Sequence, residues 1–337
     1  MLNQMRKSRL LTRFMLVVFL ALILELPASG AQATFDRIVV FGTSLSDPGN
    51  KFALDHINNT PPYTALVDPL TLVPDAAYAI GGHHLSNGRT WIEQLALPLG
   101  LEGSVRPAFA ALGGATNYAV DGARAWDDGI NVDLQEQVGK FTNDSTGIAP
   151  GGALYVMEMG SNDVRDALEK YLGPPPLPSD PAAGNLILQT ALTSIAEALE
   201  RLYQMGARQF LIWNVPDVSL TPTARRLDQA FNSGTTVRDL SRTLAQGFNA
   251  QLSVIVSNFQ QLPGVDVKVF NSFQASDEIV ANKAAFGLTD VADACIMPGL
   301  APFQCQNAGQ FLFWDGIHPT KAGHAITAQQ AATVLGL

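Results

Sequence analysis

Strand-like and helix-like segments alternate along this chain, and that order constrains its fold more than any other feature. Short apolar runs rich in β-branched and aromatic residues occur at 37–41, 153–157, 208–213 and, less regularly, 265–270. Apolar residues recur at three- and four-residue steps over 188–202 and 237–259, and a last helix is expected at about 321–334. The alternation predicts an α/β fold of three layers, with helices around a parallel sheet.

The chain shows no internal repeat and no shift in composition that would mark a domain boundary. We therefore expect residues 34–337 to form one domain. Two segments, 51–85 and the proline-rich 173–183, fit the alternation poorly. Because the first of them is long and irregular, we expect it to cover either the sheet edge or a substrate site.

Residues 1–33 have the features of a signal peptide. Four basic residues between positions 6 and 13 precede an apolar run at 14–24, and the small-residue site Ala31-Gln32-Ala33 follows. The run is short for a bilayer span and Glu25 interrupts it, although an uncleaved anchor helix is the alternative. We expect cleavage near Ala33, a secreted or periplasmic protein, and no integral membrane segment in the mature chain.

The charge of the chain limits its partners. Removing residues 1–33 takes away four basic residues and one acidic residue, so the formal net charge changes from −9 to −12. Such a chain should be repelled by nucleic acid and by anionic membranes. A lipid substrate would have to be held by apolar contacts.

The two cysteines, Cys295 and Cys305, are ten residues apart. A zinc site needs about four clustered ligands, and no neighbouring cysteine or histidine completes such a set. In an exported protein we expect a structural disulfide that closes a short loop.

A serine follows the first predicted strand, in the stretch FGTSLSDPGN at residues 41–50. Open α/β sheets place their active sites after the strand ends, so Ser44 in this turn is a candidate nucleophile. Serines at such positions also cap helices, and Ser46 is the candidate for that role.

A possible base lies near the C-terminus, in Asp315-Gly316-Ile317-His318-Pro319. The proline biases His318 away from helical geometry, and Asp315 is placed to fold back onto the imidazole Nδ1. Nε2 would then be free to take the proton of a serine. A metal site of Asp315, His318 and His324 is the alternative.

Two further stretches are candidates for binding an oxyanion, the charge that develops on an ester carbonyl during attack. Gly160-Ser161-Asn162-Asp163 follows a predicted strand, and we expect Asn162 to offer its amide while Asp163 caps the next helix. In the stretch at 117–123, Gly122 would let the backbone approach a substrate closely.

Together these motifs resemble the GDSL esterase/lipase family, also called SGNH hydrolases, and in particular its longer secreted bacterial members. The resemblance covers nearly the whole mature chain. It implies a flavodoxin-like central sheet, a catalytic triad of Ser44, Asp315 and His318, and an oxyanion hole formed by Ser44, Gly122 and Asn162. It also implies a secreted serine esterase or lipase that acts through an acyl-enzyme, needs no cofactor or metal and works as a monomer.

One position departs from the family motif, and several functions stay open. Thr43 stands where the family motif F-G-D-S-L has aspartate; its hydroxyl would replace part of that residue's hydrogen bonding in the turn. The alternatives are an acyltransferase that uses an alcohol or sterol, a carbohydrate acetylesterase, and a catalytically silent binding domain. Aromatic residues near the motifs are either part of an acyl pocket or ordinary core: Trp126, Phe311, Phe313 and Trp314.

Overall fold

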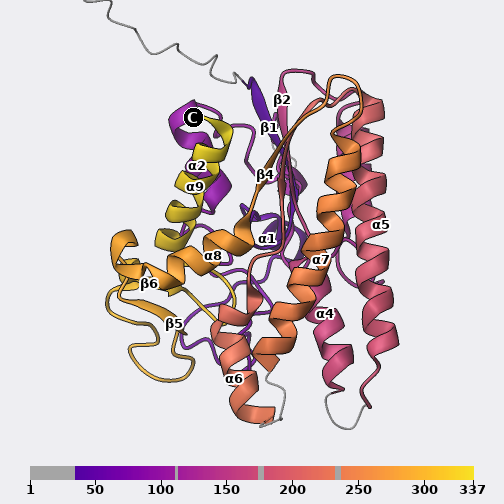
Figure 1. The fold of residues 1–337 in the computed structure, drawn as a ribbon. Coiled ribbons are helices and arrows are strands. Elements are labelled where there is room, and N and C mark those ends of the chain that lie inside the picture. The colour runs from indigo at the N-terminus through magenta and orange to yellow at the C-terminus, as the bar shows by residue number, and fades with distance from the viewer. Residues whose placement is uncertain (1–34, 111–112, 174–177, 232–236) are drawn as a thin grey trace, which may run out of the picture. The chain divides into compact units, whose positions relative to one another are not determined.

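The computed structural model describes residues 35–110, 113–173, 178–231 and 237–337, and within them a parallel sheet lies between two layers of helices (Figure 1). The strands of the sheet are β1 (Arg37–Gly42), β2 (Ala153–Glu158), β3 (Gln209–Trp213) and β4 (Asp266–Phe270). They pair in the order β1-β2-β3-β4, and every pair is parallel. The predicted α/β fold and its four strands are confirmed.

The helices of the described residues include the three that the sequence predicts, two of them from apolar periodicity. They are α1 (Asn50–Asp55), α2 (Trp91–Ala96), α3 (Leu134–Asp144), α4 (Ser161–Leu172), α5 (Pro181–Met205), α6 (Pro222–Phe231), α7 (Val237–Phe259), α8 (Ser272–Ala281) and α9 (Lys321–Leu335). A helical turn, η3 (Val218–Leu220), follows β3. A short parallel pair of strands, β5 (Asp290–Ala294) and β6 (Phe311–Phe313), was not predicted.

An extended segment completes the sheet beside β1. Its backbone hydrogen bonds to β1 run from Val40 N to the Thr116 carbonyl at 3.0 Å and from Tyr118 N to the Val40 carbonyl at 2.8 Å. With this segment on the outer side of β1, the order of sheet elements becomes 2-1-3-4-5, which is the flavodoxin-like order of doubly wound folds. The segment carries residues 117–123, so the second candidate motif lies next to the first.

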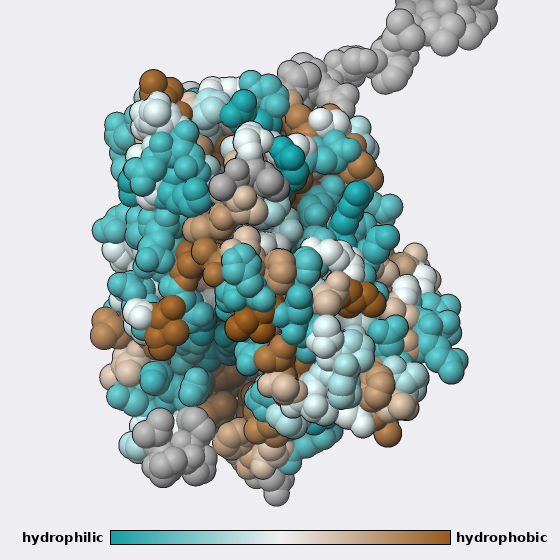
Figure 2. Space-filling view, turned by 180° about the vertical axis from the view of Figure 1, so that it is seen from behind, coloured by the Kyte–Doolittle hydropathy of each residue, from teal (hydrophilic) through white to brown (hydrophobic). Residues whose placement is uncertain are grey.

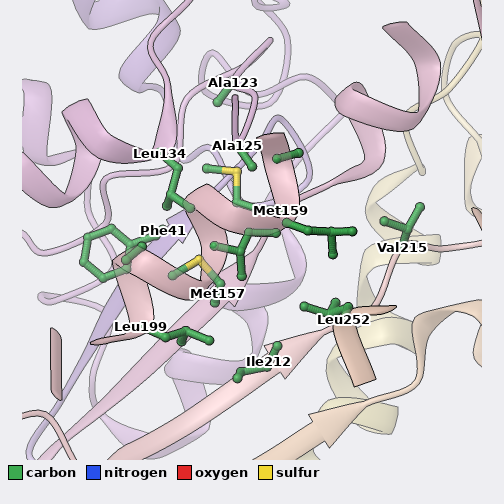
Figure 3. Packing of buried hydrophobic residues seen from close by; sticks show 14 of the residues in the cluster. Phe41, Ala123, Ala125, Leu134, Met157, Met159, Leu199, Ile212, Val215 and Leu252 are labelled. Atoms are coloured by element: carbon green, nitrogen blue, oxygen red, sulfur yellow. The ribbon is translucent and has the colours of Figure 1, made fainter. Parts of the chain in front are cut away.

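Alternate residues of the strands face the two helical layers. Phe41, Met157 and Ile212 pack with α3, α4, α5 and α7, and Figure 3 shows them together with Leu199 and Leu252 of the covering helices. On the other face, Val40, Val156 and Trp213 pack with α2 and α9. Because every strand pair is parallel, the carboxyl ends of the four strands lie at one edge of the sheet.

The N-terminal 34 residues, with the predicted signal peptide, lie outside the described residues. In the described part of the chain, no helix is long and apolar enough to cross a membrane. Cys295 and Cys305 form a disulfide, as predicted, between the end of β5 and the loop that leads to β6.

Candidate active site

Ser44 lies in the turn that leaves the carboxyl end of β1. Backbone hydrogen bonds from Ser46 N to the Thr43 carbonyl (3.0 Å) and from Asp47 N to the Ser44 carbonyl (3.4 Å) form this turn. Gln137 of α3 fixes its start, since its side-chain amide bonds both the N–H and the carbonyl of Gly42 at 2.9 Å. Ser44 itself is 6% exposed and lines a cavity.

Asp47 joins the nucleophile turn to the second motif. Its carboxylate accepts hydrogen bonds from Gly49 N, Asn50 N and Lys51 N at the start of α1 and from Asp121 N, the residue before Gly122. Burial raises the pKa of Asp47 to about 6, against these hydrogen bonds, which lower it. The N-cap of α1 is Gly49, and Asp47 rather than Ser46 accepts the N–H groups at the start of this helix, so the expectation that Ser46 caps a helix is wrong. Ser46 instead donates to Glu158 and accepts from Trp91 Nε1.

Asp315 and His318 form the pair that their spacing predicts. His318 Nδ1 lies 2.8 Å from Asp315 Oδ2, and both side chains are almost fully buried. Asp315 Oδ1 accepts the backbone N–H groups of Ile317 and His318 at 2.9 and 2.8 Å, so the loop is closed on its own acid. His318 Nε2 is buried without a hydrogen-bond partner among the described residues, and His318 lines the same cavity as Ser44.

Sequence reasoning missed Tyr78, a further partner of the acid. Its hydroxyl donates to Asp315 Oδ2 at 2.9 Å, and its ring packs edge-on against Trp314. The cluster that holds both rings also contains the disulfide Cys295–Cys305. The irregular segment that carries Tyr78 therefore contacts the acid, and other residues of this segment line the cavity beside Ser44.

Gly316 lies between Asp315 and His318, where the irregular segment at 51–85 and helix α6 come very close to the loop. A Cβ at Gly316 would collide with the carbonyl oxygen of Thr71 and with Thr223 Oγ1 of α6. Its N–H donates to the Leu72 carbonyl at 2.9 Å. Only glycine fits between these groups, and the loop that presents His318 is held against both.

Besides Ser44, the two other predicted oxyanion donors, Asn162 and Gly122, differ in their position relative to the cavity. Asn162 lines the cavity with Ser44 and His318, and its Nδ2 donates to the Ala123 carbonyl at 2.8 Å. Gly122 adopts a left-handed φ of 76° and is adjacent to Ala123, but among the described residues it is not part of the cavity wall. The structure therefore brings Asn162 to the cavity wall, whereas Gly122 is next in sequence to Ala123, the residue that Asn162 contacts.

Asp163 does not cap α4. The helix begins after Gly160 without a side-chain cap, and the buried Asp163 carboxylate accepts from Ala125 N at 3.0 Å and from Trp126 N at 3.1 Å. Burial raises the pKa of Asp163 to about 6 despite these hydrogen bonds. Asp163 thus ties the second motif to α4 at the residue next to Asn162.

The alternative metal site is not formed. In residues 35–337, where the structure describes them, no three or more His, Cys, Asp and Glu side chains are grouped to hold a metal ion. Burial, with the nearby His318 and His84, lowers the pKa of His324 to about 3. His324 is therefore a neutral core residue at physiological pH.

If His318 is the base, as the sequence predicts, its environment sets the pH dependence of the reaction. Burial alone would lower its pKa, and Arg165 lowers it as well, but the charge and hydrogen bond of Asp315, with the charge of Asp121, raise it above 6.5. A base must be neutral to accept a proton, so kcat/KM should rise with pH with a midpoint above 6.5. The pH profile of the wild type and of Asp121→Asn measures this. The variant midpoint should lie lower, and a wild-type midpoint below 6.5 would contradict the assignment of His318 as base.

The cavity beside these residues has a volume of about 680 Å³. Apolar side chains from several elements line it: Leu45, Leu70, Val73, Leu168, Leu172, Val218, Leu220, Leu227, Phe231, Ile279, Leu312 and Phe313. In the space-filling view, apolar residues border a hollow in the lower half of the face shown (Figure 2). Of the four aromatic residues considered from sequence, Phe313 lines the cavity, whereas Trp126, Phe311 and Trp314 pack in or against the core clusters.

Comparison with known proteins identifies relatives over most of the chain. A model of the GDSL-like lipase/acylhydrolase family matches residues 38–331. A GDSL esterase/lipase of Arabidopsis thaliana is 29% identical over 336 residues, which cover 87% of this chain and 80% of the relative. A second from the same plant is 25% identical and covers 86% and 85% of the two chains.

An extracellular lipase from Streptomyces rimosus is similar in structure with a TM-score of 0.37 and 14% identity, covering 88% of this chain and 99% of that one. The two curated relatives described above are plant proteins, so they do not support the expected bacterial subtype.

Proposed function

Because this chain belongs to the GDSL-like lipase/acylhydrolase family, we propose that it hydrolyses carboxylic esters with Ser44 as nucleophile, His318 as base and Asp315 as orienting acid. The observation that carries the proposal is the buried contact of 2.8 Å between Asp315 Oδ2 and His318 Nδ1. This contact fixes the ring and leaves Nε2 without a partner in the cavity that Ser44 lines.

The reaction proceeds in two steps. His318 Nε2 takes the proton of Ser44 Oγ as this oxygen attacks the ester carbonyl, and the resulting imidazolium is stabilised by Asp315. His318 then gives the proton to the leaving alcohol, which leaves an acyl group on Ser44 Oγ. In the second step His318 takes a proton from water, the hydroxide oxygen attacks the acyl carbonyl, and the acid leaves as Ser44 regains its proton.

The oxyanion of each tetrahedral intermediate is bound by N–H groups at the cavity wall and next to it. Asn162 Nδ2 carries two hydrogens and donates one to the Ala123 carbonyl, so the second is available to the substrate. The backbone N–H groups of Ser44 and Gly122 complete the set. The Asp47–Asp121 and Asn162–Ala123 hydrogen bonds support these groups by holding both motifs together.

The acyl group that the chain accepts is a medium or long aliphatic chain. Fifteen leucine, valine, isoleucine and phenylalanine side chains are among those that line the cavity beside Ser44, and its volume of about 680 Å³ far exceeds that of an acetyl group. An aliphatic chain gains about 0.8 kcal/mol for each methylene that it buries. Apolar contacts of this kind suit an acidic protein that an anionic surface repels.

A series of p-nitrophenyl esters from acetate to palmitate tests the acyl group. We expect kcat/KM to rise from acetate to at least octanoate. Ala275→Phe, which adds a ring to the cavity wall, should shift the preference to shorter chains. Ala281→Phe is the matched control, because Ala281 is exposed on the same helix, α8. A preference for acetate alone would contradict the proposal and point to a carbohydrate acetylesterase.

We also propose that residues 1–33 are a signal peptide, that residues 34–337 are the hydrolase domain and that the mature protein acts outside the cytoplasm as a monomer. The disulfide between Cys295 and Cys305 supports export, because such bonds persist in oxidising compartments.

A further inference from the structure

A buried carboxylate outside the triad lies directly beneath the nucleophile turn. Glu158 is the last residue of β2 and pairs in register with Gly42, the last residue of β1. It is 3% exposed. None of the proton transfers described above uses it.

Glu158 accepts hydrogen bonds from the residues on both sides of Ser44. Its Oε2 accepts from Thr43 N at 3.0 Å, and the Thr43 hydroxyl lies 3.0 and 3.1 Å from its two oxygens. Oε2 also accepts from Ser46 Oγ at 3.1 Å. Ser46 Oγ is in turn held by Trp91 Nε1 at 2.9 Å, so this side of the turn is anchored to the core.

The set of donors suits an ionised carboxylate. Burial raises the pKa of Glu158 to about 7, while the hydrogen bonds from Thr43 and Ser46 and the charge of His318 lower it. The N–H and hydroxyl of Thr43 and the hydroxyl of Ser46 all donate to Glu158, and an ionised carboxylate is an acceptor only. Leaving a buried charge without such donors is costly, so the turn and the carboxylate stabilise each other.

Glu158 also accounts for threonine at position 43. An aspartate there would bring a second carboxylate to within hydrogen-bond distance of Glu158, where the Thr43 hydroxyl now lies. Two carboxylates at that distance cannot both ionise easily. Thr43 supplies a donor instead, and the single carboxylate of the turn comes from β2.

We propose that Glu158 is the positioning residue of the nucleophile turn and supplies, from β2, the carboxylate that the family motif carries at residue 43. It fixes Thr43 and Ser46, and through them the direction in which Ser44 Oγ and the Ser44 N–H face the cavity. This inference rests on the proposed role of Ser44. It predicts that the carboxylate can be moved from residue 158 to residue 43.

The experiment compares Glu158→Gln, Thr43→Asp and the double variant Thr43→Asp/Glu158→Gln with the wild type, using p-nitrophenyl butyrate. Glu158→Gln should lower kcat by roughly 10- to 100-fold, the effect of losing hydrogen bonds to one charged group, with little change in KM. Thr43→Asp alone should also lose activity, because it adds a second buried acid. The double variant should recover most of the kcat that Glu158→Gln loses.

Glu197→Gln, on the exposed face of α5, is the matched control and should behave as wild type. Thermal melting of each variant separates positioning from folding. If Glu158→Gln does not fold, Thr43→Val removes only the hydroxyl that faces the carboxylate and should lower kcat without raising KM.

Full kcat in a folded Glu158→Gln or Thr43→Val variant would overturn the inference. So would a double variant that is no more active than Glu158→Gln. Failure of the proposed function gives a different result, since the wild type itself would then not hydrolyse the ester.

Discussion

Replacing Ser44 by alanine should lower kcat for p-nitrophenyl butyrate by roughly 10⁴- to 10⁶-fold, because the acyl-enzyme can no longer form. KM should change little, since the cavity and Asn162 are untouched. The measurement is steady-state hydrolysis at a pH above the midpoint of the wild-type profile, with the folded state of the variant checked by thermal melting.

Ser46→Ala is the control for this prediction, since Ser46 lies in the same turn, is buried and is also a serine. It should lose much less activity than Ser44→Ala, because the change removes one of the hydrogen bonds to Glu158 and leaves the nucleophile in place. Equal losses in the two variants would show that the turn, and not the Ser44 hydroxyl, is what the first substitution damages.

Replacing Asp315 by asparagine should lower kcat by roughly four orders of magnitude. Asp315 accepts from Nδ1 of His318, from two backbone N–H groups and from Tyr78 Oη. An amide cannot accept from all of them, and an amide nitrogen facing Nδ1 favours the tautomer with the proton on Nε2. That tautomer cannot take a proton from Ser44. Kinetics with the same ester measure the effect.

Tyr78→Phe is the companion variant, because it removes one donor and keeps the carboxylate. It should lose about tenfold or less, the scale of one hydrogen bond to a charged group. An Asp315→Asn enzyme that keeps its kcat within a factor of about ten would show that the His318 tautomer is set by something other than Asp315.

The sequence predicts those elements of the fold whose burial produces a local apolar pattern. Strands β1, β2 and β3 are buried on both faces, so their apolar runs stand out in the sequence, whereas β4 buries only Val267 and Phe270 and its run is less regular. The pair β5–β6 did not stand out, since β6 has only three residues and the pairing is irregular. The segment beside β1 contains Tyr118 and belongs to the sheet only through backbone hydrogen bonds to a distant strand.

In the candidate site, likewise, the sequence predicts contacts between residues that are close in the chain and misses those between distant residues. The Asp315–His318 contact spans three residues, so its spacing predicted it. Tyr78 and Gln137 contact the site from 237 and 95 residues away, and no local pattern marks them. The prediction that Asp163 caps a helix is wrong for the same reason, because its partners, the N–H groups of Ala125 and Trp126, are 38 and 37 residues away in the sequence.

Glu158 and Thr43 illustrate what the sequence can and cannot indicate about the site. Its position at the end of a buried strand gave no sign of function, whereas the departure at Thr43 marked the turn as unusual. Only the structure connects the two, through hydrogen bonds between residues 115 positions apart. A departure from a motif is therefore informative when its spatial neighbours are known.

Mass spectrometry after treatment with a fluorophosphonate, a reagent that phosphonylates activated serines, tests the central claim most directly. We predict one adduct per wild-type chain, located by peptide sequencing at Ser44, and loss of hydrolysis in step with labelling. Ser44→Ala should remain unlabelled. Labelling at a different serine, or full ester hydrolysis by a completely labelled enzyme, would contradict the assignment of Ser44 as the nucleophile.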